Sequence, residues 1–119
     1  MPMHELSACM ELIDQVEAIA RSHEAERVDT IVLRIGSLSG VEPGLLESAF
    51  EMARLGTVAE HARLRTERIE PRIRCRACGL EADAGPGDLR CPACFGTDTA
   101  LIAGDEMILA RIELLQTAD

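Results

Sequence analysis

The chain has no tryptophan, no tyrosine and no lysine, and only two of its 119 residues are phenylalanine. Without lysine, Schiff-base chemistry and the lysine of a phosphate-binding P-loop are excluded. With so few aromatic rings, single-stranded nucleic acid has almost nothing on which to stack its bases. The charge balance points the same way, because 21 acidic residues against 12 arginines give a formal net charge of −9. An acidic chain is not attracted to a phosphate backbone, so we predict no nucleic-acid partner.

Long apolar runs are also missing. No stretch reaches the roughly 18 apolar residues that a membrane-spanning helix needs, so the sequence predicts no membrane span. Residues 1–5 show neither the basic start nor the apolar segment of a secretory signal, and we expect a cytoplasmic protein. Thiols stay reduced in the cytoplasm, so the five cysteines indicate metal ligands or catalytic thiols rather than disulfides.

The apolar pattern predicts a small α+β domain. Apolar residues recur at spacings of three and four in residues 5–22 and 43–54, which indicates two amphipathic helices. Residues 28–35, 61–70 and 106–115 favour strands. We therefore expect two helices on a three-stranded, mainly antiparallel sheet. In the last strand, alternation places four residues on one face: Ile108, Ala110, Ile112 and Leu114.

The segment between the last two predicted strands differs in composition. Residues 73–103 are rich in Gly, Pro, Asp and Cys and show no long apolar periodicity. A segment this short cannot bury enough apolar surface to fold by itself. We predict a separate zinc-binding module at 73–103, inserted into a nickel-binding α+β domain formed by residues 1–72 and 104–119.

Four cysteines supply what this module lacks. They form two CxxC pairs, Cys75 with Cys78 and Cys91 with Cys94, and twelve residues separate the pairs. Two such turns can direct four thiolates at one tetrahedral centre, which suits a structural Zn²⁺ closed to catalysis. Iron fits the same sulfur shell. Two redox pairs or two disulfides would also account for the four cysteines, although a thioredoxin-like pair would open a helix after a strand. Cys9, the fifth cysteine, lies on the apolar stripe of the first helix and is expected to be a core residue.

The ends of this pattern resemble a known family. Met3-His4-Glu5 leads into the first helix, the loop from Gly36 to Pro43 leads into the second, and the two CxxC pairs follow. This layout, from Met3 to about Glu113, resembles the HypA/HybF family of hydrogenase nickel-incorporation proteins. The resemblance implies a metallochaperone, not an enzyme. It implies that Ni²⁺ is carried at Met3, His4 and Glu5 and Zn²⁺ at the four cysteines. It also implies work with the nickel GTPase HypB to load the large-subunit precursor of [NiFe]-hydrogenase and, in some organisms, service to urease.

The nickel ligands depend on where the mature chain begins. Ni²⁺ favours nitrogen donors and tolerates square-planar geometry. A chain that begins at Met3 offers the Met3 amine, the His4 amide and imidazole, and the Glu5 amide. A chain that begins at Pro2 offers the Pro2 amine, the Met3 amide, and the His4 amide and imidazole. If Met1 is retained, the Pro2 nitrogen is a tertiary amide and cannot be deprotonated, so the chelate is disrupted.

Several questions stay open at the level of sequence. A zinc-ribbon adaptor that binds a protein partner without nickel would also explain the cysteines. Six arginines between Arg63 and Arg76 form either a solvated strand face or a docking patch for an acidic partner. Glu5 either orients His4, contacts the partner GTPase, or is an ordinary first-turn acid. His23 and His61 are not expected to bind metal. Domain swapping around the inserted module would give a homo-oligomer.

Overall fold

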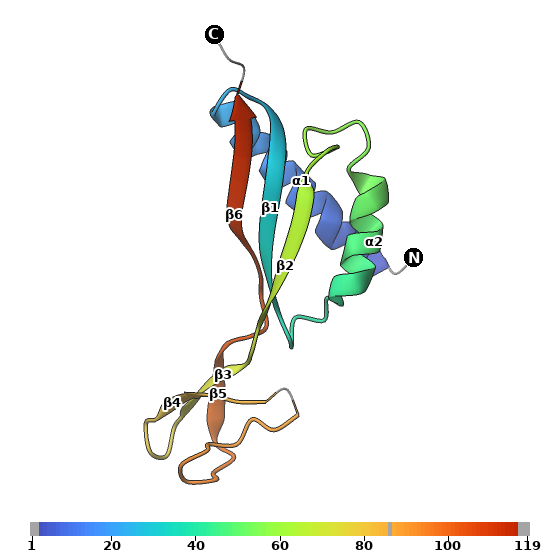
Figure 1. Ribbon diagram of the computed structural model, residues 1–119. Coiled ribbons are helices and arrows are strands. Elements are labelled where there is room, and N and C mark those ends of the chain that lie inside the picture. The colour runs from blue at the N-terminus through green and yellow to red at the C-terminus, as the bar shows by residue number, and fades with distance from the viewer. Residues whose placement is uncertain (1–2, 86, 117–119) are drawn as a thin grey trace.

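The computed structural model describes residues 3–85 and 87–116. In chain order the elements are α1 (Met3–Ser22), β1 (Ala25–Gly36), α2 (Pro43–Ala53), β2 (Arg63–Ile69), β3 (Arg72–Cys75), β4 (Glu81–Asp83), β5 (Thr99–Ala103) and β6 (Met107–Gln116). Figure 1 shows two sheets, a larger one beside the helices and a smaller one at the far end of the molecule. The predicted α+β class with two helices is confirmed. In the described part of the chain, neither helix is long and apolar enough to cross a membrane.

The main sheet has the strand order β2-β1-β6, with the longest strand in the middle. β1 pairs with β6 in antiparallel and with β2 in parallel orientation. The parallel pairing follows from α2, which connects β1 to β2 as a helical crossover. In the small sheet, β3 lies between β4 and β5 and both pairings are antiparallel. Antiparallel pairing therefore dominates over the two sheets together, although the main sheet is mixed.

One prediction about β6 is wrong. Ile108 and Ala110 were expected to share the core face with Ile112 and Leu114, but both are exposed. The register between β1 and β6 shifts between Val32 and Leu33, where the paired residues change from 111 to 109. The extra residue on β6 is a bulge, and a bulge reverses the alternation of side chains. The residues of β6 that pack against the core are Met107, Leu109, Ile112 and Leu114.

The core lies between the main sheet and the two helices. It joins the apolar stripe of α1 to Ile31, Leu33 and Ile35 of β1 and to Phe50 of α2. Cys9 belongs to this core, as predicted: its side chain is 0% exposed. Its Sγ–H donates to the carbonyl of Leu46 at 3.4 Å, and burial raises the pKa of the thiol to about 11. A thiol that stays protonated in the core is not a nucleophile.

The small sheet was not foreseen. Its strands contain only three to five residues each, too few for a period-2 pattern to stand out. Ile73 is fully buried at its centre. The sheet runs from residue 72 to residue 103, and the division into domains at 72/73 and 103/104 remains a prediction. Two chain segments connect this sheet to the main sheet, one between β2 and β3 and the other between β5 and β6.

The loop after β1 contacts both of these connections. The N–H groups of Ser37 and Leu38 donate to the carbonyls of Ile69 and Gly104, at 3.0 and 2.8 Å. The backbone approaches are close because the crossing point is made of glycine. A Cβ atom on Gly36 would lie 2.2 Å from the carbonyl oxygen of Gly104, and one on Gly104 would lie 2.6 Å from the Cα of Pro71. Glycine at these two positions therefore permits the two sheets to join.

We expect Gly104→Ala to destabilise the fold by about 2 kcal/mol or more, because it adds a backbone clash to a strained φ. Gly104 has a φ of +108°, which a residue with a Cβ rarely adopts. The measurement is thermal unfolding followed by circular dichroism. Gly85→Ala is the matched control, since nothing lies within 4 Å of the added atom. Equal melting temperatures for the two variants would contradict this account of the junction.

Candidate metal centre

The first CxxC pair forms a tight turn at the end of β3. The N–H of Gly79 donates to the carbonyl of Cys75 at 2.8 Å, and the N–H of Cys75 donates to the carbonyl of Leu80 at 2.8 Å. Gly79 has a φ of +80°, which a glycine adopts without strain. The turn points the N–H of Cys78 back at the Cys75 sulfur, 3.5 Å away. This local geometry brings both sulfurs to one side of the turn.

The second pair repeats the same turn. The N–H of Phe95 donates to the carbonyl of Cys91 at 2.9 Å, and the N–H of Cys91 donates to the carbonyl of Gly96 at 3.0 Å. Phe95 takes the place that Gly79 has in the first turn and shares its left-handed backbone, with a φ of +59°. A side chain there is strained. The Phe95 ring is 71% exposed, so packing does not compensate for the strain.

The two turns bring all four sulfurs together. The Sγ atoms of Cys75 and Cys94 are 3.6 Å apart, as are those of Cys78 and Cys91, and all four lie within 4.8 Å of one another. A tetrahedral Zn²⁺ with Zn–S bonds of about 2.3 Å requires sulfurs about 3.8 Å apart. The four thiols therefore fit a tetrahedral metal ion. Cys75 and Cys91 are buried and Cys78 and Cys94 are exposed, so the cluster opens to solvent on one side.

The thiols of the metal-free cluster differ in acidity. The backbone N–H groups of Cys94 and Ala93 lower the pKa of Cys91 to about 7. At Cys78 the N–H of Leu80 acts in the same direction, but the neighbouring Cys91 outweighs it and the pKa rises to about 11. Since a metal ion binds thiolates, all four sulfurs must lose their protons when it enters. The cluster therefore binds metal more weakly as the pH falls.

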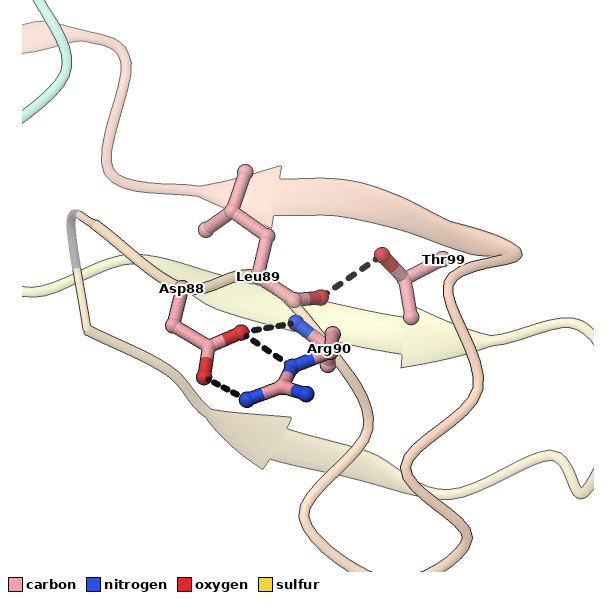
Figure 2. Close-up of polar contacts among 4 residues, drawn as sticks. All are labelled: Asp88, Leu89, Arg90 and Thr99. Carbon is pink, nitrogen blue, oxygen red and sulfur yellow. Dashed lines mark hydrogen bonds and ion pairs between the residues drawn. The ribbon is translucent and has the colours of Figure 1, made fainter.

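The loop before the second pair is held by polar contacts (Figure 2). The carboxylate of Asp88 accepts hydrogen bonds from the backbone N–H, Nε and Nη2 of Arg90, at 3.1, 2.9 and 2.8 Å. Arg90 lowers the pKa of Asp88 to about 2. The hydroxyl of Thr99 donates to the carbonyl of Leu89 at 2.8 Å, which ties the loop to β5. These contacts position Cys91 against the small sheet.

The predicted arginine patch is divided by the structure. Its three C-terminal members belong to the small sheet region and form ion pairs: Arg72 with Asp83 at 3.0 Å, Arg74 with Glu81, and Arg76 with Asp98 at 2.9 Å. Their charges are locally neutralised. A docking patch that spans the whole run from Arg63 to Arg76 is therefore not what these residues form.

The predicted nickel residues lie elsewhere, at the start of α1. The helix begins at Met3, and the exposed His4 occupies its first turn. A Cβ atom on Gly40 would lie 3.6 Å from Nε2 of His4, so the imidazole lies beside the loop after β1. A cavity of about 270 Å³ opens there, and His4, Glu11, Asp105 and Met107 are among its lining residues. Figure 1 shows this end of α1 well away from the small sheet, so the structure does not bring His4 and the cysteines together.

Glu5 has a role that the sequence alone did not reveal. Its side chain is only 4% exposed, and its Oε1 accepts the backbone N–H of Glu42 at 3.3 Å. Glu42 in turn is the N-cap of α2, and its Oε2 accepts the N–H of Leu45 at 2.7 Å. Glu5 thus fixes the loop that lies beside His4. Sequence reasoning missed Glu42, for which the signal was an acidic residue directly before Pro43 at a helix start.

The comparisons with known proteins bear on the whole chain. Residues 3–114 match the family model described as "Hydrogenase/urease nickel incorporation, metallochaperone, hypA". The hydrogenase maturation factor HypA of Nitrosospira multiformis is 45% identical over 115 residues, which cover 97% of this chain and all of that protein. HypA of Aquifex aeolicus is 42% identical over 112 residues, 94% of this chain and 97% of that protein.

A solved structure agrees with these relatives. The solution structure of the Ni metallochaperone HypA from Helicobacter pylori superposes with a TM-score of 0.74 at 27% identity and covers 95% of this chain and 98% of that one. The resemblance seen in the sequence is therefore confirmed. The chain belongs to the HypA family of hydrogenase/urease nickel-incorporation metallochaperones.

Proposed function

We propose that this protein carries Ni²⁺ for the maturation of [NiFe]-hydrogenase and holds a structural Zn²⁺ at Cys75, Cys78, Cys91 and Cys94. The observation that carries the proposal is the pairing of an exposed histidine in the first turn of a helix with a separate, closed set of four thiols. One set suits a cargo ion that enters and leaves. The other suits an ion that stays.

The nickel ligands are His4 and the backbone nitrogens around it. Because α1 begins at Met3, the N–H groups of His4 and Glu5 have no acceptor four residues earlier in the helix. These amides can be deprotonated without loss of a helical hydrogen bond. Together with the imidazole and the terminal amine they make the nitrogen set that square-planar Ni²⁺ favours. Glu5 contributes its amide, since its carboxylate is engaged with Glu42. Amines at Met1 or Pro2 lie outside the described residues.

The zinc assignment rests on the donor set and its spacing. Four thiolates at tetrahedral separation suit Zn²⁺, whose filled d-shell imposes no competing geometry. All four positions are occupied by protein, so no open site is left for a substrate. The protein therefore performs no catalysis at this metal, and we propose that it is a carrier and not an enzyme.

The partners follow from the same proposal. A carrier needs a protein that receives the metal, which we propose to be the large-subunit precursor of [NiFe]-hydrogenase. We propose the nickel GTPase HypB as the protein that assists the transfer, and the cytoplasm as the place where it occurs. The net charge of −9 disfavours nucleic acid as a partner. A zinc-ribbon adaptor without nickel is the second candidate, and metal analysis separates the two: the carrier binds one zinc and one chelatable nickel, the adaptor zinc only.

The test is delivery of nickel to a hydrogenase large-subunit precursor. We expect nickel-loaded wild type to activate the precursor and His4→Ala to lose most of this activation, because the side-chain ligand is gone. His61→Ala is the matched control, since His61 is also exposed but lies in the loop before β2. Equal activation by wild type and His4→Ala would overturn the proposed nickel site.

A further inference from the structure

The main sheet has one face without a helix. Core residues of β1 and β6 point to the side where α1 and α2 pack, and Figure 1 shows the opposite face turned toward the viewer with no helix across it. Alternation and register place nine residues on this open face. We name these nine residues the open-face patch: Thr30, Val32 and Arg34 of β1, Arg63, Arg65 and Glu67 of β2, and Ile108, Arg111 and Glu113 of β6.

The patch is basic on a strongly acidic protein. It holds four arginines against two glutamates, whereas the whole chain has a net charge of −9. Two of the arginines have carboxylate partners within the patch, Arg34 with Glu67 at 3.3 Å and Arg111 with Glu113 at 3.1 Å. Over the described ranges 3–85 and 87–116, Arg63 and Arg65 form no ion pair or side-chain hydrogen bond. Their guanidinium donors are available to another molecule.

The centre of the patch is apolar. Val32 is only 7% exposed although no helix covers it. Its two cross-strand neighbours are Arg65 on β2 and Arg111 on β6, and arginine stems of this kind cover apolar surface while their charged ends stay in water. At the β6 edge Ile108 is 42% exposed. An apolar centre within a charged and arginine-rich rim is the composition of a protein interface.

We propose that the open-face patch docks a carboxylate-rich surface of a protein partner, with Arg63 and Arg65 as its free donors. Guanidinium groups bind carboxylates in bidentate fashion, and Arg is enriched at interfaces for this reason. The module arginines contrast with these two, because Arg72, Arg74 and Arg76 are already paired within the chain. The partner is a maturation protein, so this inference rests on the proposed function.

The position of the patch suits such a role. α1 contacts β1 and β6 from the helix-covered side, and His4 lies in its first turn. A partner on the open face therefore leaves the imidazole uncovered. Docking and release of the metal can then occur on opposite sides of the sheet without competing for one surface.

The test compares Arg65→Glu with Arg21→Glu. Both residues are exposed arginines, and both variants change the net charge equally, but Arg21 lies in the last turn of α1. The probes are purified HypB and the hydrogenase large-subunit precursor, each titrated against nickel-free protein at low salt. We expect Arg65→Glu to raise the Kd for one of the two by about tenfold or more, and Arg21→Glu to change it less than about twofold. Arg65→Lys, which keeps the charge, is expected to retain most of the affinity.

Salt and nickel measurements separate the explanations. The wild-type affinity should fall with added salt, and it should fall less in Arg65→Glu. Circular dichroism checks that each variant is folded. Equal weakening by Arg65→Glu and Arg21→Glu, or no change in Kd for either probe, would overturn the docking surface. Nickel affinity is measured in the same samples: if wild type binds no nickel the proposed function fails, whereas unchanged partner binding by Arg65→Glu defeats this inference alone.

Discussion

Cys91→Ser unfolds the small sheet and leaves the main sheet and both helices folded. Cys91 is fully buried, and its Sγ lies 3.6 Å from that of Cys78. A structural zinc ion contributes about 10–16 kcal/mol of apparent binding free energy in small zinc domains, and that free energy drives their folding. Few apolar side chains remain to replace it, because Ile73 is the one aliphatic residue of the small sheet's described strands in the buried class.

The measurements are bound zinc by elemental analysis and amide hydrogen exchange by segment. In Cys91→Ser we expect less than one zinc per chain and lost protection over residues 72–103, with protection retained in β1 and α1. The matched control is Cys9→Ala, which also removes a buried thiol but lies in the main core and should keep its zinc. Full zinc content together with a protected small sheet in Cys91→Ser would contradict the structural role of the metal.

Chelation should reproduce this effect in the wild-type chain, and its pH dependence has a definite sign. Zinc binds thiolates, so protons compete with it. Hydrogen bonds from backbone N–H groups hold the pKa of Cys91 at about 7, and proton competition at this ligand therefore becomes strong as the pH falls below that value. A chelator should remove zinc faster at pH 5 than at pH 8.

The local patterns in the sequence predicted more than the distant contacts did. The spacing of the CxxC pairs determines the turn geometry within five residues, so the four-sulfur cluster could be foreseen. The helices were placed within two residues of their observed ends, because their apolar periodicity is long. The bulge in β6 was not foreseen, since the shift appears only when β6 is aligned with β1. Its consequence was the wrong assignment of Ile108 and Ala110.

The role of Glu5 shows the same limit. An acid in the first turn of a helix is ordinary by sequence, and nothing near it suggests burial. Its hydrogen-bond partner, Glu42, lies 37 residues away, and the contact exists only because α1 packs against α2. The split of the arginine run is also a tertiary effect. Arg74 pairs with Glu81 across β3 and β4, whereas Arg65 lies on the open face of another sheet.

Nickel affinity depends strongly on where the chain begins. We expect versions with a free amine at Met3 or Pro2 to bind Ni²⁺ at least about 100-fold more tightly than a version that retains Met1, because even the loss of an outer-shell partner changes metal affinity by about 10–100-fold. In the Met1 version the nitrogen of Pro2 is a tertiary amide and cannot become a ligand. Intact-mass measurement identifies each version, and calorimetric titration at fixed pH gives its affinity.

Two substitutions in the Met3 version test which atoms bind. His4→Ala removes the imidazole and should abolish tight binding. Glu5→Gln keeps the backbone amide and should retain it, because the Glu5 carboxylate accepts the N–H of Glu42 and is not needed by the metal. Affinity in wild type should rise with pH, since the amine, amides and imidazole must lose protons to bind. If Glu5→Gln weakened nickel binding as much as His4→Ala, the carboxylate would be a ligand, and loading nickel would then require Glu5 to leave the loop that it holds beside His4.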